Sequence, residues 1–243
     1  MTSIERIELA AAPEGSIPVD AQALSRLLAE RFSCRAVRSE PVPDVLVDRM
    51  LAIAQMAPSW CNTQPWRVTV TSGDETERLR RALLAEAEQG VSVQTPDIAF
   101  PAAYTGARLE RRREVGWQLY ESAGIEKGDR DGSARQAREN QRLFGAPHVL
   151  LIHTARELGT YGVLDCGVYL GTLLLAAQSL GLGIVPQAAL AMHSALIRRQ
   201  FCVPDDEIFV VGASFGFAET SHPVNNFRSR RAPLGASVRK ITT

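Results

Sequence analysis

A run of five residues, Arg31-Phe-Ser-Cys-Arg35, alternates polar and apolar side chains. An extended backbone points successive side chains in opposite directions, so the two arginines and Ser33 are predicted to face one way. Phe32 and Cys34 are predicted to turn to the core. Two guanidinium groups and a hydroxyl suit a terminal phosphate, because charge-assisted and bidentate hydrogen bonds are strong. The alternative is a pair of surface arginines that follow a helix.

A second polar run lies between two prolines in residues 58–66. Its polar side chains are Ser59, Asn62, Thr63 and Gln64. Hydroxyl and carboxamide groups both donate and accept hydrogen bonds, which suits a flat heterocycle with alternating C=O and N–H groups. Trp60 and Trp66 are expected to form apolar walls. The alternative is an ordinary helix-to-strand turn in which Asn62 and Gln64 bond the local backbone.

The tail after Val224 has no helical period and is expected to lie extended over another part of the protein. It carries Arg228, Arg230 and Arg231, which could complete the phosphate site that Arg31 and Arg35 begin. A solvent-exposed basic tail is the alternative.

Other motifs are set aside. Residues 212–216 match the G-x-S-x-G nucleophile elbow, but the chain ends too soon after Ser214 for the remaining strands, acid and histidine of a hydrolase. A strand whose glycines allow another segment to approach is the preferred interpretation. The histidines and cysteines lack metal-ligand or disulfide spacing, so no metal site is expected and the cysteines are interpreted as reduced packing residues. These residues are His148, His153, His193, His222, Cys34, Cys61, Cys166 and Cys202.

The apolar periods predict an α+β fold. Helices are expected over residues 21–31, 43–56, 74–90, 104–124, 132–143 and 164–180, and strands over 66–72, 148–153, 183–186 and 208–212. In the first helix, Leu24, Leu27 and Leu28 have core-facing spacing. Residues 91–104 have no period and are interpreted as a long loop, which is often functional. The three arginines at 111–113 are interpreted as a solvated helix face rather than an anion site.

The composition is that of a globular protein, with 45% hydrophobic residues and equal numbers, 27 each, of basic and acidic residues. Zero net charge gives no electrostatic case for nucleic acid binding. The apolar stretch at 168–182 is broken by polar residues and is interpreted as a buried helix, not a membrane span. No signal peptide is evident, so a cytoplasmic location is expected. We expect an N-terminal extension, 1–20, and one domain, 21–243.

Five segments in this order resemble the nitroreductase family of FMN-dependent oxidoreductases. They are residues 31–35, 57–66, 182–189, 211–218 and 223–234, so the resemblance runs from about residue 21 to the end. The branch that contains aryl nitroreductases, such as nitrobenzoate reductases, is the most similar. The resemblance implies an antiparallel-rich sheet wrapped by helices and an intertwined homodimer. Two FMN sites would lie at the subunit interface, and the extended C-terminal tail would embrace the partner.

The resemblance also implies cofactor contacts. The FMN phosphate and ribityl would be held by Arg31, Phe32 (through its backbone), Ser33 and Arg35, joined by Arg231 and Arg228. From the other subunit, Pro58, Ser59, Asn62 and Gln64 would border the isoalloxazine, and Pro186, Gln187 and Ala188 would run along the flavin with a backbone N–H near N5. Phe32 departs from the family, which often has Arg or His there.

The implied function is reduction of nitroaromatics or quinones by NADPH or NADH, in a ping-pong hydride transfer through flavin N5 that needs no catalytic acid or nucleophile from the protein. Phe100 and Tyr104 in the long loop are candidate stacking surfaces for the substrate. The alternatives are a flavin-fragmenting or dehalogenating enzyme of the same fold, a non-catalytic flavin-binding or sensing protein, and the hydrolase.

Overall fold

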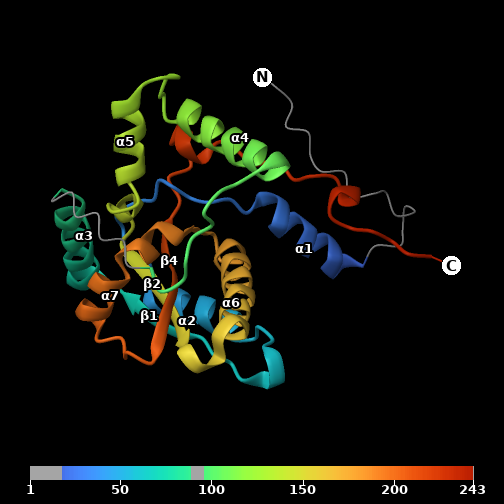
Figure 1. Cartoon of the computed structure of the whole chain (residues 1–243), viewed down its shortest axis with the longest axis horizontal. Helices are drawn as coiled ribbons and strands as arrows, with labels where there is room; N and C mark the ends of the chain where they lie inside the picture. Colours follow the sequence, from blue (N-terminus) through green and yellow to red (C-terminus); the bar gives the residue numbers. More distant parts are fainter. Residues whose placement is uncertain (1–17, 89–95, 243) are drawn as a thin grey trace.

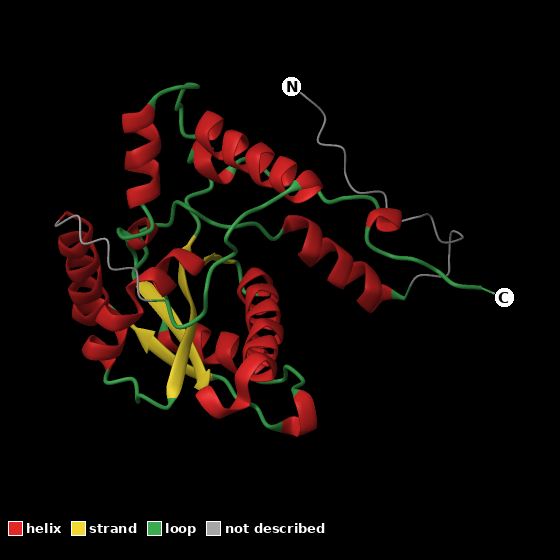
Figure 2. Cartoon of the chain, viewed as in Figure 1, coloured by secondary structure: helices red, strands yellow, loops and turns green. Residues whose placement is uncertain are grey.

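The computed structural model describes residues 18–88 and 96–242. Its centre is a four-stranded antiparallel sheet in the order β1-β2-β4-β3 (Figure 2). The strands are β1 (Arg67–Thr71), β2 (His148–Ala155), β3 (Leu182–Gln187) and β4 (Glu207–Phe217). The helices are α1 (Val19–Glu30), α2 (Asp44–Ala54), α3 (Gly73–Glu88), α4 (Gly106–Ser122), α5 (Arg130–Arg138), α6 (Gly159–Ser179) and α7 (Ser194–Phe201).

The sheet is covered on both faces, which explains why β2 is an almost continuous apolar run. Leu150 and Ile152 face α2 and α6, where they pack with the core that includes Tyr169. Val149 and Leu151 point the opposite way, into a second core that α3 and α7 help to build. Figure 1 shows this compact block with α1, α4 and the C-terminal tail lying outside it.

The expected α+β fold with an antiparallel sheet is confirmed, and each expected helix and strand is found, although α6 begins five residues earlier and β4 ends five residues later than expected. Two side-chain expectations are wrong. No residue of α1 is buried, and Leu24 and Leu28 are 49% and 53% exposed, because α1 lies beside α6 rather than against the sheet. Cys61, in the short helical turn Trp60–Asn62, and Cys202, at the C-terminal end of α7, are exposed, whereas Cys34 and Cys166 are buried.

The most apolar helix is longer than its sequence period suggests. The helical stretch Arg156–Ser179 is long and apolar enough to cross a membrane by length and composition, so the polar residues within 168–182 do not by themselves exclude a membrane span. Its contacts, rather than its length, assign it to a folded core, because α6 packs on α2, β2 and β3. Its outward side keeps Tyr161, Leu164 and Val168 exposed.

The segment after α1 lies along the sheet edge. Ser33 forms a parallel bridge with Ile184 of β3, and Val37 forms an antiparallel bridge with Ala218 just after β4. The Cys34 N–H donates to the Ile184 carbonyl at 3.1 Å. This approach requires a glycine on β3, because a Cβ on Gly183 would lie 2.5 Å from the Cys34 Sγ atom.

We therefore predict that Gly183→Ala destabilises the protein by about 1–3 kcal/mol, because the added methyl group overpacks this contact. The free energy of unfolding in urea measures the change. Gly116→Ala is the control: a Cβ there meets nothing within 4 Å, and alanine is favoured in a helix by up to about 1 kcal/mol. A Gly183→Ala protein as stable as the wild type would contradict the prediction.

Candidate functional site

Residues 31–35 have the predicted polar character, with one change. Arg31, Ser33 and Arg35 are half-buried and Cys34 is buried. Phe32, however, does not turn to the core: its ring lies under the Arg228 guanidinium, with 3.9 Å between the Arg228 Cζ atom and the ring centroid. Isolated bridges hold this segment, not a continuous strand, so strict alternation is not imposed and Phe32 meets the tail instead.

Asn225 ties the C-terminal tail to this segment. Its Oδ1 accepts the Arg35 N–H at 2.9 Å, and its Nδ2 donates to the carbonyls of Ala36 (2.7 Å) and Glu219 (2.9 Å). The side chain is 3% exposed. This role is hard to predict from the sequence, because Arg35 and Ala36 are 190 and 189 residues away from Asn225. The one local signal is a polar Asn in a short turn after a proline.

The tail also orients Arg228. Its Nη1 donates to the carbonyls of Asn225 (2.8 Å) and Phe227 (2.9 Å), while the Phe32 ring supports the guanidinium plane. Arg230 turns elsewhere and pairs with Glu114 of α4 at 2.7 Å. The tail arginines are thus separated into Arg228 and Arg231, which interact with Arg31, and Arg230, which does not.

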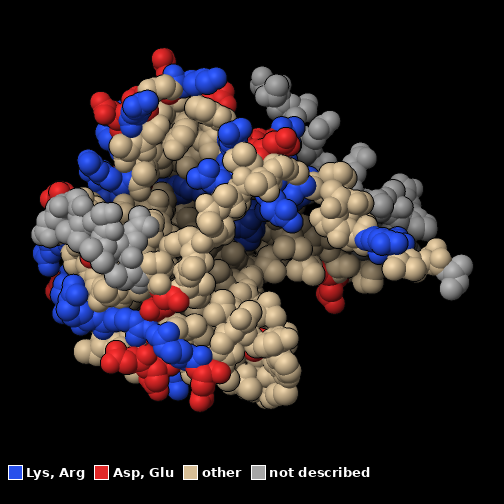
Figure 3. Space-filling view, viewed as in Figure 1, with Lys and Arg blue, Asp and Glu red and all other residues tan. Residues whose placement is uncertain are grey.

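Positive charge converges without compensation on four arginines, which we call the arginine cradle: Arg31, Arg35, Arg228 and Arg231. In the part of the chain that the structure describes, no carboxylate lies within 4.0 Å of any of them. Burial lowers the pKa of Arg35 and Arg228. Burial, and then repulsion by Arg231 and Arg228, lowers the pKa of Arg31. Such an arrangement favours a bound anion with more than one charge, and Figure 3 shows blue side chains around a hollow beneath α4.

Hydrogen bonds within the loop at 58–64 stabilise its conformation. Cys61, Asn62 and Gln64 all have left-handed backbone, with φ of 49°, 55° and 46°. The Gln64 N–H donates to Ser59 Oγ at 2.8 Å, and its Nε2 donates to Asn62 Oδ1 at 3.1 Å. These bonds match the alternative in which Asn62 and Gln64 bond locally, and they support backbone conformations that cost free energy on their own.

Trp60 and Trp66 lie in different environments, one exposed and the other in the core. Trp66 is a core residue rather than a pocket wall, because it stacks on Tyr169 at 5.0 Å and donates to Gln55 Oε1 at 3.0 Å. Trp60 is exposed, contacts Tyr161 edge to face, and lines a pocket of about 210 Å³ together with Cys61 and Asp165.

At the end of β3, the Gln187 side chain is buried, so at this residue the backbone is the part that a ligand can contact. Gln187 is 2% exposed; its Oε1 accepts a hydrogen bond from Ser214, and its Nε2 donates to the Asn140 carbonyl at 3.0 Å. Ser214 therefore belongs to a continuous, buried strand and not to a nucleophile elbow. Pro186 is half-buried and Ala188 is exposed, so the Pro186 ring, the Ala188 methyl group and the backbone of 187–188 can meet a ligand, whereas the Gln187 side chain is buried.

The structure brings some of the residues predicted to bind the cofactor close together and leaves others apart. Ser33 bridges to β3 two residues before Pro186, so the cradle and the end of β3 are neighbours. Among the described residues, no hydrogen bond, ion pair or ring contact joins loop 58–64 to the cradle. Phe100 and Tyr104 lie on the segment before α4 and are 41% and 42% exposed.

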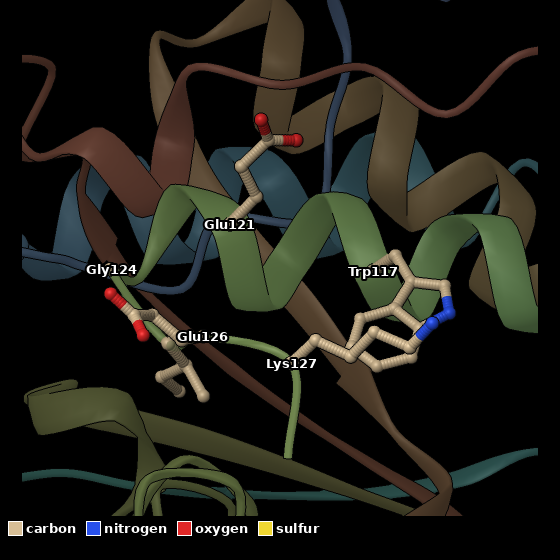
Figure 4. Close-up of a pocket in the computed structure, with 6 residues that line it drawn as sticks. Trp117, Glu121, Gly124, Glu126 and Lys127 are labelled. Carbon is tan, nitrogen blue, oxygen red and sulfur yellow. The ribbon is translucent and has the colours of Figure 1, made fainter. Parts of the chain in front are cut away.

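Figure 4 shows a separate pocket of about 480 Å³ at the C-terminal end of α4. Lys127 approaches the ring of Trp117, with its Nζ 6.0 Å from the ring centroid. None of the residues predicted to bind a cofactor lines this pocket. In residues 18–88 and 96–242, no group of three or more His, Cys, Asp or Glu side chains could hold a metal ion.

Comparison with known proteins assigns this arrangement to a family. The model of the nitroreductase family matches residues 28–217, which include the first cradle arginines, loop 58–64 and all four strands. The chain belongs to the nitroreductase family. Its relatives include nitroreductase NfnB of Mycolicibacterium smegmatis, 35% identical over 93% of this chain and 96% of the relative.

The chain also resembles 4-nitrobenzoate reductase of Pseudomonas putida, at 34% identity over 84% of this chain and 89% of the relative. Among solved structures, the FMN and NADPH-dependent nitroreductase NfnB from Sphigopyxis sp. strain HMH has a TM-score of 0.86 and 34% identity, covering 90% of this chain and 99% of that one. These findings confirm the expected fold and the similarity to aryl nitroreductases.

We predict that Asn225→Ala lowers the free energy of unfolding by about 1–3 kcal/mol, because the part-buried Arg35 N–H loses its acceptor and the carbonyls of Ala36 and Glu219 each lose one donor. Chemical denaturation measures the change. Asn226→Ala, in the exposed neighbouring position, is the control and is expected to stay within about 0.5 kcal/mol of the wild type. Equal effects of the two substitutions would show that Asn225 does not tie the tail to residues 31–36.

Proposed function

We propose that this protein is an FMN-dependent oxidoreductase that reduces nitroaromatic compounds with NADPH. The observation that carries the proposal is the arginine cradle, in which four arginines converge without a carboxylate partner among the described residues. The names of its relatives, which are nitroreductases and nitrobenzoate reductases, support the reaction class. The similar solved structure is described as FMN and NADPH-dependent, which supports both cofactors.

The residues fit the phosphate end of FMN. A phosphate dianion would relieve the repulsion that Arg231 and Arg228 exert on Arg31, and the guanidinium groups can bind it through charge-assisted hydrogen bonds. We assign Ser33 and the Phe32 backbone to the same end. Bound FMN supplies two-electron transfer, whereas the protein supplies binding, orientation and a positive electrostatic environment.

The other contacts of the proposed site follow from the exposed backbone at the end of β3. Pro186, Gln187 and Ala188 would lie along the flavin, with the Gln187 side chain remaining in its buried hydrogen bonds. Because no described contact brings loop 58–64 to the cradle within one chain, we propose that Pro58, Ser59, Asn62 and Gln64 of one protomer complete the site of the other.

A homodimer would also cover the apolar surface that a single chain leaves open. This surface comprises Leu24 and Leu28 of α1 and Tyr161, Leu164 and Val168 of α6. α1 and α6 are in contact, so the exposed side chains form parts of one region. We propose that this region is the subunit interface and that the tail beyond the cradle extends over the partner.

We further propose that the electron donor and the oxidant use the same open face in turn, which gives ping-pong kinetics, and that quinones are accepted as well as nitroaromatics. Phe100, which is 41% exposed, would supply an aromatic contact for a flat oxidant. No acid, base or nucleophile of the chain is required in this scheme.

The test is the absorbance of the purified protein after FMN loading, followed by anaerobic addition of NADPH. We expect flavin bands that bleach, and recovery of the bands when a nitroaromatic compound is added. Bands that persist with NADPH would favour a non-catalytic flavin-binding protein. A protein that takes up no FMN would overturn the proposal.

Arg35→Gln is expected to raise the dissociation constant for FMN by at least about 10-fold, since a charge-assisted contact contributes about 1.5–3 kcal/mol. Fluorescence titration of the apoprotein with FMN measures the change. Arg230→Gln is the matched control, because it removes the same charge from a residue that pairs with Glu114 instead. Equal losses in both variants would mean that net charge, and not the cradle, sets FMN affinity.

For the homodimer, we predict that Leu24→Glu shifts the protein from dimer towards monomer in sedimentation velocity, because a buried unpaired charge is costly in an interface. Val45→Glu adds the same charge at a 72% exposed position of α2 and is expected to leave the dimer intact. A wild-type protein that sediments as a monomer would exclude the proposed assembly.

A further inference from the structure

Helix α4 carries four arginines that the proposed flavin site does not use: Arg108, Arg111, Arg112 and Arg113. All four are exposed, and in the described chain none lies within 4.0 Å of a carboxylate. Arg108 and Arg112 are four residues apart, so their side chains share one face of the helix. Like charges at this spacing destabilise a helix. No residue of α4 is buried, so packing in the core does not account for these arginines.

An aromatic ring accompanies this pair. Tyr104 lies just before α4, and the Arg112 guanidinium stands over its ring, with 5.4 Å between the Arg112 Cζ atom and the ring centroid. The tyrosine is 42% exposed, so part of its surface stays open. A ring that can stack on a base, beside guanidinium groups that can bind a phosphate, suits a nucleotide with a phosphate close to its base.

The position of α4 brings these groups close to the proposed flavin site. α4 contacts the short helical turn Pro223–Asn225, which begins the tail, and Glu114 of α4 pairs with Arg230. The same tail places Arg228 on Phe32 in the cradle. Figure 1 shows α4 and the tail running together along one side of the molecule. These contacts tie α4 to the tail that contributes Arg228 and Arg231 to the cradle.

We propose that Tyr104, Arg108 and Arg112 form the subsite for the adenosine 2′-phosphate of NADPH. The adenine would stack on Tyr104, and the two guanidinium groups would bind the phosphate. NADH has a hydroxyl group in place of this phosphate, so Arg108 and Arg112 would have no negatively charged group to bind. The two arginines would therefore select NADPH over NADH. This inference rests on the proposed function, since it assigns the donor of the same reaction.

The first test compares donor selectivity in the FMN-loaded enzyme. Arg112→Gln and Arg108→Gln are each expected to lower kcat/KM for NADPH by about 10-fold or more, and to change the value for NADH by less than about 2-fold. Arg113→Gln is the matched control. It removes the same charge from the next position of the helix, which points about 100° away, and it is expected to keep the wild-type selectivity.

The second test measures binding without turnover. Isothermal titration of the FMN-loaded protein with adenosine 2′,5′-bisphosphate is expected to show binding that Arg112→Gln weakens at least about 10-fold, whereas adenosine 5′-phosphate binds weakly to both proteins. Tyr104→Leu is expected to weaken the bisphosphate too, because the ring that stacks on adenine is lost.

Several results would overturn the subsite. Equal losses for NADPH and NADH would place the contact at the pyrophosphate that both donors share. A wild-type enzyme without preference for NADPH, or an Arg113→Gln variant as impaired as Arg112→Gln, would also exclude it. These results differ from failure of the proposed function, in which the protein binds no FMN or its flavin is reduced by neither donor.

Discussion

Repulsion among the cradle arginines is the constraint on which the site depends. Arg31 and Arg228 are far apart in the sequence, and burial, followed by repulsion from Arg231 and Arg228, lowers the pKa of Arg31. Neutral contacts therefore hold the two segments together: the amide of Asn225 bonds the backbone at Arg35, and the Phe32 ring supports Arg228. Because no carboxylate is used for this purpose, the positive charge remains available to a ligand.

The sheet and its two cores provide a fixed edge for this assembly. β2 sends alternate apolar side chains into both cores, and β3 forms the edge on which residues 33–34 lie. The buried bonds of Gln187 to Ser214 and Asn140 fix the end of that edge strand. The polar site is thus built on the rim of an apolar frame, and its side chains need not disturb the frame.

The local sequence pattern predicted the sheet and its helices well, because each apolar period depends only on residues that are close in the sequence. The run at 148–153 indicated a buried strand, and the alternation at 31–35 indicated an anion site. The interactions that join distant segments were beyond such reasoning. Nothing near Phe32 shows that Arg228 will cover it, and nothing near Asn225 shows that Arg35 will bond it. The exposed face of α1 escaped prediction for a related reason: an apolar period shows that a helix has a partner, but not whether the partner is in the same chain.

The distribution of the cradle along the chain has a consequence for biosynthesis. Arg31 precedes all four strands in the sequence, whereas Arg228 and Arg231 follow β4. The sheet can form once residue 217 has left the ribosome, but the four arginines cannot meet until the tail has emerged as well. A ligand that depends on all four can therefore bind only after the tail has followed β4 out of the ribosome, so the sheet can form before that ligand binds.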